Sequence, residues 1–205
     1  NAQRQRLKNR GITSADDDNF TGIAIDSDNP KSPNPTFILP DQALLKVTSL
    51  PDNYQLSKHF TLAALSSKAV VSKYPVEAQG GLTYGQIVYN LAAVALNILE
   101  PTLALFPNMM VTSGFRTVEA SNPNSQHTKG QAADIQIRGI SKNDYFEVAK
   151  KLANNLNYDQ LLLEYKTTGT GMPWIHISIN VSGQRSQVLT LLNDKKYSAG
   201  LTKLA

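Results

Sequence analysis

Apolar residues recur at helical spacing in two stretches of the chain. The first predicted helix begins after Thr83, which has capping-box spacing to Gln86. Its apolar face follows the three-to-four-residue interval of an amphipathic helix: Ile87, Leu91, Val94 or Ala95, and Ile98. Pro101 is expected to end or kink this helix, because proline lacks the backbone N–H group. A second helix is predicted from Ser141 and Asp144, and its apolar face includes Val148, Leu152 and Leu156.

Strand patterns alternate with these helices in the C-terminal half of the chain. The predicted strands cover residues 109–112, 132–138, 160–165, 174–181 and 187–192. In the second of them a period of two puts Ala133, Ile135 and Ile137 on one face and Asp134, Gln136 and Arg138 on the other. The Gly- and Thr-rich stretch 166–173 is expected to close a hairpin. The pattern predicts an α+β domain with a mainly antiparallel sheet and flanking helices.

Residues 1–52 differ in composition and are predicted to form an extended arm or linker ahead of a domain at 53–205. The stretch 16–18 is an acidic cluster, and 29–35 is a proline-rich spacer. A short apolar patch at 37–39 is expected to dock on a partner or on the domain itself, and the alternative is a flexible tether.

Composition narrows the class of protein. A chain of 205 residues can bury one main core with an appendage. The net charge of +4 and the pI near 9.2 are too weakly basic to favour nucleic acid as a partner, but they suit an anionic bacterial envelope.

We expect no membrane span, since the most apolar stretch, 91–106, is interrupted by Asn97, Glu100 and Pro101. The chain starts at Asn1, which suggests a processed or fragmentary sequence. Cysteine is absent, so a metal would need His, Asp or Glu ligands.

Asp134 and His176 are polar residues inside otherwise apolar runs. Burying a carboxylate costs several kcal/mol unless the group is paired or bound to a metal. His127, in the polar loop before the Asp134 strand, adds a third candidate donor. Three N and O ligands leave a fourth position for water, as in catalytic zinc sites. On the residues alone, Asp134 pairing with Arg116 or Arg138 is the alternative.

Three ordered motifs carry a family resemblance: residues 112–117, 125–134 and 174–178. Together they resemble the signature of the zinc D-Ala-D-Ala carboxypeptidase superfamily. That group includes vancomycin-resistance dipeptidases, phage L-alanyl-D-glutamate endolysins and the Hedgehog signalling domain. The segments 56–62 and 158–165 are similar to the phage and bacterial branch. The resemblance covers about residues 54–200 and implies a Hedgehog/DD-peptidase-like fold.

The resemblance also implies roles for individual residues. His127, Asp134 and His176 are its zinc ligands. Arg116 matches the family arginine that binds substrate near the scissile carbonyl or its carboxylate, a task that suits a planar guanidinium; the alternative is a structural partner for Asp134. Ser125 matches a serine that holds the substrate or the loop.

The general base is the point at which this sequence departs from the family. Many relatives carry a Glu or Asp three residues before the last histidine ligand, where this chain has Pro173. Glu164, one hairpin arm away from His176, is the expected acid/base residue. The alternative for Glu164 is a rim carboxylate paired with a surface cation such as Lys166, and Asp159 is the reserve candidate.

These residues and the resemblance predict a zinc metallopeptidase that cleaves peptidoglycan stem peptides, at a D-Ala-D-Ala or an L-Ala-D-Glu bond. Trp174 shares the face of His176 and is expected to line the bottom of the substrate pocket or to pack in the core. The arm is expected to join a phage tail, baseplate or envelope assembly. This places the protein in a virion or outside the cytoplasm at the cell wall, with the cytoplasm as the alternative. A non-catalytic binding or assembly domain and an intracellular dipeptidase are the competing functions.

Overall fold

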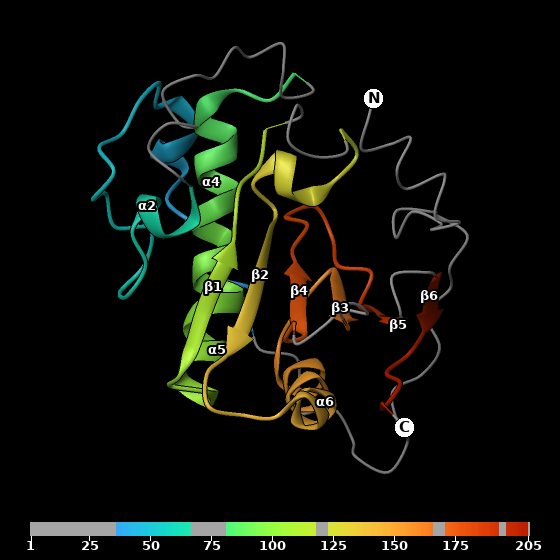
Figure 1. Cartoon of the computed structure of the whole chain (residues 1–205). Helices are drawn as coiled ribbons and strands as arrows, with labels where there is room; N and C mark the ends of the chain where they lie inside the picture. Colours follow the sequence, from blue (N-terminus) through green and yellow to red (C-terminus); the bar gives the residue numbers. More distant parts are fainter. Residues whose placement is uncertain (1–35, 67–80, 118–122, 166–170, 193–195, 205) are drawn as a thin grey trace.

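The computed structural model describes residues 36–66, 81–117, 123–165, 171–192 and 196–204. In these residues a six-stranded sheet packs against helices, which confirms the α+β class with a mainly antiparallel sheet (Figure 1). The strands are β1 (Met109–Ser113), β2 (Ala132–Ile137), β3 (Gln160–Glu164), β4 (Trp174–Ser178), β5 (Gln187–Leu192) and β6 (Lys196–Ala199). The longer helices are α4 (Tyr84–Val94), α5 (Glu100–Leu105) and α6 (Tyr145–Asn155), and a short one is α2 (Leu62–Leu65).

The first predicted helix begins as expected and continues past Pro101. Thr83 and Gln86 form both hydrogen bonds of the capping box at the start of α4. Between α4 and α5 lies a π-helical segment, η3 (Ala95–Leu99), and Pro101 follows in the first turn of α5. A π-helical turn shifts the backbone pairing from i→i+4 to i→i+5, which accommodates the missing N–H of proline. The helix therefore changes its geometry before Pro101 instead of ending there.

The combined helix Tyr84–Leu105 is long and apolar enough, by length and composition alone, to cross a membrane. The expectation of no membrane span was based on the stretch 91–106, which lacks residues 84–90 of this helix. Within the domain, 72% of the most apolar window of this helix is buried. Core helices of folded domains have the same character.

The strand order in the sheet is β1-β2-β4-β3-β5-β6. Neighbouring strands are antiparallel except β3 and β5, which are parallel. The predicted pairing of the strands on either side of 166–173 is confirmed, and residues 166–170 of that connection lie outside the described residues. β4 ends at Ser178, three residues earlier than predicted, and β6 was not predicted.

The two faces of the sheet have different roles. One face joins the helices in the hydrophobic core through Ala133, Ile135 and Ile137 of β2 and Ile175 and Ile177 of β4, as the period of two predicted. The residues that alternate with these, including Asp134 and His176, lie on the opposite face. The fold therefore presents polar side chains on a rigid sheet whose other face is held by the core.

Part of the segment predicted as an arm is described, and residues 36–52 lie against the domain. The 3-10 helix η1 (Gln42–Lys46) buries Leu44 and contacts α4. Asn97 bonds both backbone groups of Ile38, accepting from its N–H at 2.7 Å and donating to its carbonyl at 2.8 Å. The remaining residues of the predicted arm, 1–35, lie outside the described residues.

Candidate metal centre

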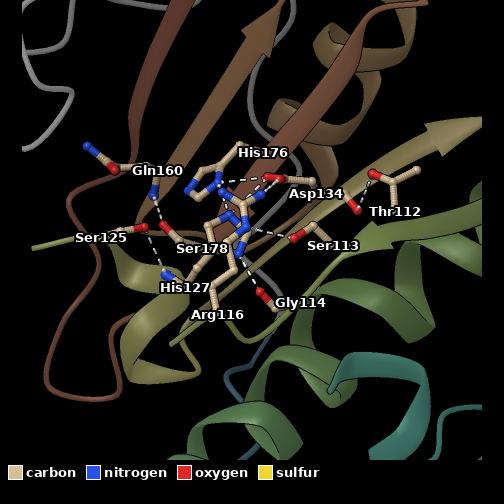
Figure 2. Close-up of polar contacts among 10 residues, drawn as sticks. All are labelled: Thr112, Ser113, Gly114, Arg116, Ser125, His127, Asp134, Gln160, His176 and Ser178. Atoms are coloured by element: carbon tan, nitrogen blue, oxygen red, sulfur yellow. Dashed lines mark hydrogen bonds and ion pairs between the residues drawn. The ribbon is translucent and has the colours of Figure 1, made fainter. Parts of the chain in front are cut away.

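Three buried side chains from three elements meet at one point, as Figure 2 shows. Asp134 of β2 and His176 of β4 are cross-strand partners, and His127 arrives from the 3-10 helix η4 (Gln126–Lys129). Oδ1 of Asp134 lies 3.1 Å from Nε2 of His127 and 3.0 Å from Nδ1 of His176. The two imidazole nitrogens are 3.0 Å apart. The three candidate ligands therefore present one donor atom each to a shared point.

His127 is held in place by backbone contacts on both sides. Its Nδ1–H donates to the carbonyl of Gly114 at 2.6 Å, which fixes the ring orientation and leaves Nε2 facing the cluster. The Ser125 hydroxyl caps η4 by accepting from the His127 N–H at 3.3 Å. Gly130 ends η4 in the left-handed conformation, with φ of 70°. Ser125 thus has the loop-stabilising contact in this structure, while its role toward substrate stays a prediction.

The buried cluster brings together groups that bind a cation. Burial lowers the pKa of His127 and so favours its neutral form. Burial alone would raise the pKa of Asp134, but the adjacent His127 and His176 outweigh it and hold that pKa well below its usual range. With Nδ1 of His127 donating to Gly114, the Nε2 atom of the neutral ring is the one that faces the shared point. A cation at that point would bind this nitrogen together with the ionised carboxylate of Asp134.

The donor set fits zinc. Imidazole nitrogen and carboxylate oxygen bind zinc at about 2.0–2.2 Å, which separates tetrahedral ligand atoms by roughly 3.3–3.6 Å. The observed separations of 3.0–3.1 Å are a few tenths of an ångström shorter. The ring of His127 is also oriented as a metal ligand requires, because the Gly114 carbonyl accepts from its outer nitrogen. His127, Asp134 and His176 are therefore the residues that would hold the metal.

Arg116 lies beside the cluster and contacts Asp134. Its Nη2 pairs with Oδ2 of Asp134, and its Nε donates to the Ser113 hydroxyl at 2.8 Å (Figure 2). Its backbone N–H also donates to the His127 carbonyl at 3.2 Å. The side chain remains 34% exposed, so its outer edge is accessible to a ligand. The structure thus contains the pairing with Asp134 that the sequence left as an alternative, and Arg138 instead contacts the Met110 sulfur.

Glu164 lies on the same sheet face as His176. In the register of β3 and β4, Leu162 pairs with His176, and Glu164 pairs with Trp174. Glu164 is therefore a diagonal neighbour of His176, and such neighbours lie roughly 7–8 Å apart. Glu164 and Trp174 are both half-buried, whereas Pro173 is buried. The register leaves the acid/base role of Glu164 and the substrate role of Trp174 as predictions.

Asp159, the reserve candidate for the base, is held elsewhere. It pairs with Arg185, whose Nη2 lies 2.6 Å from Oδ2 of Asp159. An acidic residue at the start of a strand is ordinarily a turn residue, and nothing local in the sequence marks Arg185 as the partner of Asp159. His59, the third histidine of the chain, lies outside the cluster, and its Nδ1 is 2.7 Å from Oε2 of Glu100.

Comparison with known families identifies the class. The sequence model of the family Peptidase M15 matches residues 58–178, so the chain belongs to that family. The matched range contains all three candidate ligands, Arg116 and Glu164. The match confirms the resemblance to the zinc D-Ala-D-Ala carboxypeptidase superfamily, whose members are in general zinc-dependent. A comparison with curated proteins finds no match.

Proposed function

We propose that this protein is a zinc-dependent peptidase that cleaves the stem peptides of peptidoglycan. The observation that carries the proposal is the buried His127, Asp134 and His176 cluster, whose donor atoms lie within 4.8 Å of one another, in a member of a peptidase family. Zinc at such a cluster polarises a scissile carbonyl and lowers the pKa of water toward about 7.

Glu164 is the proposed acid/base residue. It lies on the sheet face of His176, diagonal to it in the β3–β4 register. From there it takes a proton from the attacking water and returns that proton to the leaving amine. This assignment replaces the carboxylate that many relatives have at the position of Pro173.

Arg116 and Trp174 are the proposed substrate-binding residues. The exposed edge of the Arg116 guanidinium can donate to a carbonyl or carboxylate oxygen of the peptide, while Nη2 stays on Asp134. Trp174 pairs with Glu164 across the strands and so lies beside the proposed base. Ser125 supports the substrate indirectly, through the loop that it caps.

We infer the cell wall as the place of action. A D-Ala-D-Ala or an L-Ala-D-Glu bond is the proposed target, since both belong to substrates of the superfamily that the motifs resemble. A net charge of +4 favours approach to an anionic envelope. Delivery by a virion or action outside the cytoplasm would bring the enzyme to this substrate, with residues 1–52 as the proposed attachment.

Digestion of purified peptidoglycan tests the proposal. The zinc-loaded protein is incubated with the wall beside His176→Ala and Glu164→Ala, and the products are analysed by mass spectrometry. We expect released D-Ala or new amino termini with the wild type, and neither with the variants. Bound zinc at one ion per chain without any cleavage would contradict the peptidase.

One observation favours a second candidate, a non-catalytic binding domain of the same fold. Pro173 occupies the position of the carboxylate that many relatives use as base. A binding domain would retain stem peptides with equal affinity in the wild type and in Glu164→Ala, without releasing any product. Equilibrium binding of a soluble stem peptide distinguishes this case from catalysis.

A further inference from the structure

A second buried aspartate lies outside the metal cluster and is saturated with donors. Asp159 is 1% exposed. Oδ1 accepts from the backbone N–H of Arg185 at 2.9 Å and from its Nε at 3.0 Å. Oδ2 accepts from Nη2 of Arg185 at 2.6 Å and from Nε2 of Gln126 at 2.7 Å. The carboxylate therefore joins two segments of the chain that the sheet does not pair.

The first link leads to His127. Gln126 immediately precedes His127 in η4, and its side chain is buried. Its backbone carbonyl accepts from the Gln131 N–H at 2.9 Å, at the other end of the same turn. Asp159 thus fixes Gln126 by its side chain, while the turn fixes it by its backbone. A shift of Gln126 would carry His127 with it.

The second link leads to His176. The backbone N–H of Asp159 donates to the Ser178 carbonyl at 2.8 Å, and Ser178 lies two residues after His176 in β4. The Ser178 hydroxyl accepts from the Gln160 N–H at 3.0 Å, which strengthens the same connection (Figure 2). One residue therefore contacts both of the elements that supply a histidine.

Stability alone does not explain this arrangement. The Asp159 carboxylate is buried, whereas the side chain of Arg185 remains 39% exposed. Burying a carboxylate is costly, and apolar residues of similar volume are often as stable as an ion pair. What a bidentate pair adds is a fixed geometry, since the guanidinium fork accepts one orientation of the carboxylate. A metal site needs its ligands held within about 0.5 Å.

We propose that Asp159 and Arg185 form a positioning pair that holds His127 and His176 at the separation required for metal binding. Gln126 transmits the restraint to His127, and Ser178 transmits it to His176. The proposal rests on the proposed metal site and extends it to residues that do not touch the metal.

Metal binding without turnover tests the pair. Zinc affinity is measured by competition with a chromophoric chelator, and the visible spectrum of the cobalt(II)-substituted protein reports ligand geometry. For Asp159→Asn we expect zinc affinity to fall by about 10–100-fold, as for other residues that support ligands, and the cobalt spectrum to change. Arg185→Lys retains the charge without the fork, so we expect an intermediate loss.

Two further variants keep the test decisive. Gln126→Met removes only the link to His127 and leaves the Asp159–Arg185 pair intact. It therefore tests the positioning role even if Asp159→Asn fails to fold. We expect a loss of affinity for this variant as well. Glu100→Gln, in the ion pair with His59, is the matched control, and we expect lower stability with an unchanged cobalt spectrum.

Wild-type zinc affinity and an unchanged spectrum in folded Gln126→Met and Asp159→Asn would overturn the proposal. That result would leave the proposed peptidase function intact. Conversely, a wild-type protein that binds zinc but never cleaves peptidoglycan would contradict the function and leave the positioning pair intact.

Discussion

Asp134 and His176 face each other across β2 and β4, in register and on the same side of the sheet. Directly opposite residues in antiparallel strands have Cβ atoms about 4.5–5.5 Å apart, so the sheet by itself brings two of the three donors together. His127 completes the cluster from η4, seven residues before Asp134 in the sequence. Strand register therefore determines most of the geometry of the candidate metal centre.

Zinc should stabilise the folded protein measurably. The cluster of His127, Asp134 and His176 is assembled only in the folded chain, so bound metal shifts the equilibrium away from the unfolded state. At a free zinc concentration of about 1,000 times Kd, linkage predicts about 4 kcal/mol of added stability. Thermal unfolding with zinc and after dialysis against a chelator measures this difference. Equal melting temperatures in both conditions would argue against a folded-state metal site.

Glu164→Gln should slow catalysis strongly while leaving the metal in place. Loss of a general acid/base group lowers kcat by about 10²–10⁴-fold. The amide retains the shape of the side chain, so zinc content and melting temperature should stay near those of the wild type. Glu147→Gln, an exposed position in α6, is the matched control and should retain full activity. A Glu164→Gln enzyme with wild-type kcat would exclude Glu164 as the base.

Gly114→Ala should damage the fold and the metal centre together. A Cβ atom at position 114 would lie 2.1 Å from the carbonyl oxygen of Leu65, and backbone atoms cannot rotate away. We expect a loss of about 3 kcal/mol, at the upper end of overpacking effects. The displaced Gly114 carbonyl would also lose its bond to His127, so zinc affinity should fall at least about ten-fold.

Gly139→Ala provides the comparison for that variant. Gly139 has φ of 81°, and a Cβ atom there would meet nothing within 4 Å. Its cost should be the left-handed backbone penalty alone, about 1–2 kcal/mol, with unchanged zinc affinity. Chemical denaturation and chelator competition on both variants measure the two effects separately. Equal zinc affinity in both variants would show that the Gly114 carbonyl does not position His127.

The Asp159 ion pair should make stability depend on acid pH. Burial raises the pKa of Asp159, but the hydrogen bonds from Arg185 outweigh it, and the folded-state pKa lies below the usual value. The unfolded chain therefore binds this proton first as the pH falls. The stabilisation is complete above about pH 5 and disappears as the pH falls through the folded-state pKa, below about 3.9.

Asp159→Asn removes this contribution. We expect a loss of about 2 kcal/mol at pH 7, in the range of hydrogen bonds to charged groups, and a smaller difference from the wild type near pH 3. Urea unfolding of both proteins at several pH values provides the measurement. A difference that stays constant from pH 7 to pH 3 would contradict the ion-pair origin of the effect.

Local periodicity was enough to predict most of the secondary structure. The alternation in β2 predicted which side chains enter the core and which face away, and the structure confirms it. β6 was missed because Lys196–Ala199 is a short, partly exposed strand without an apolar alternation. The parallel pairing of β3 with β5 could not be predicted from the local residue pattern either, since it depends on contacts between segments far apart in sequence.

The candidate site was predictable to the extent that its residues are locally anomalous. Asp134 and His176 stand out because each interrupts an apolar strand, and the structure brings both together with His127. Asp159 carries no such signal, because an acidic residue before a strand is ordinary. Its partner Arg185 lies 26 residues away, and only the folded chain reveals their contact.

The π-helical segment Ala95–Leu99 rotates the side-chain directions of α5 relative to those of α4. Each residue of an α-helix advances the side-chain direction by about 100°, so one wide turn redirects every side chain that follows it. Glu100 is the first residue after this turn, and from there its carboxylate reaches Ser57 at 2.7 Å and His59 at 2.7 Å. The rotation thus directs the side chain of Glu100 toward residues 57–59, where the match to the family model begins.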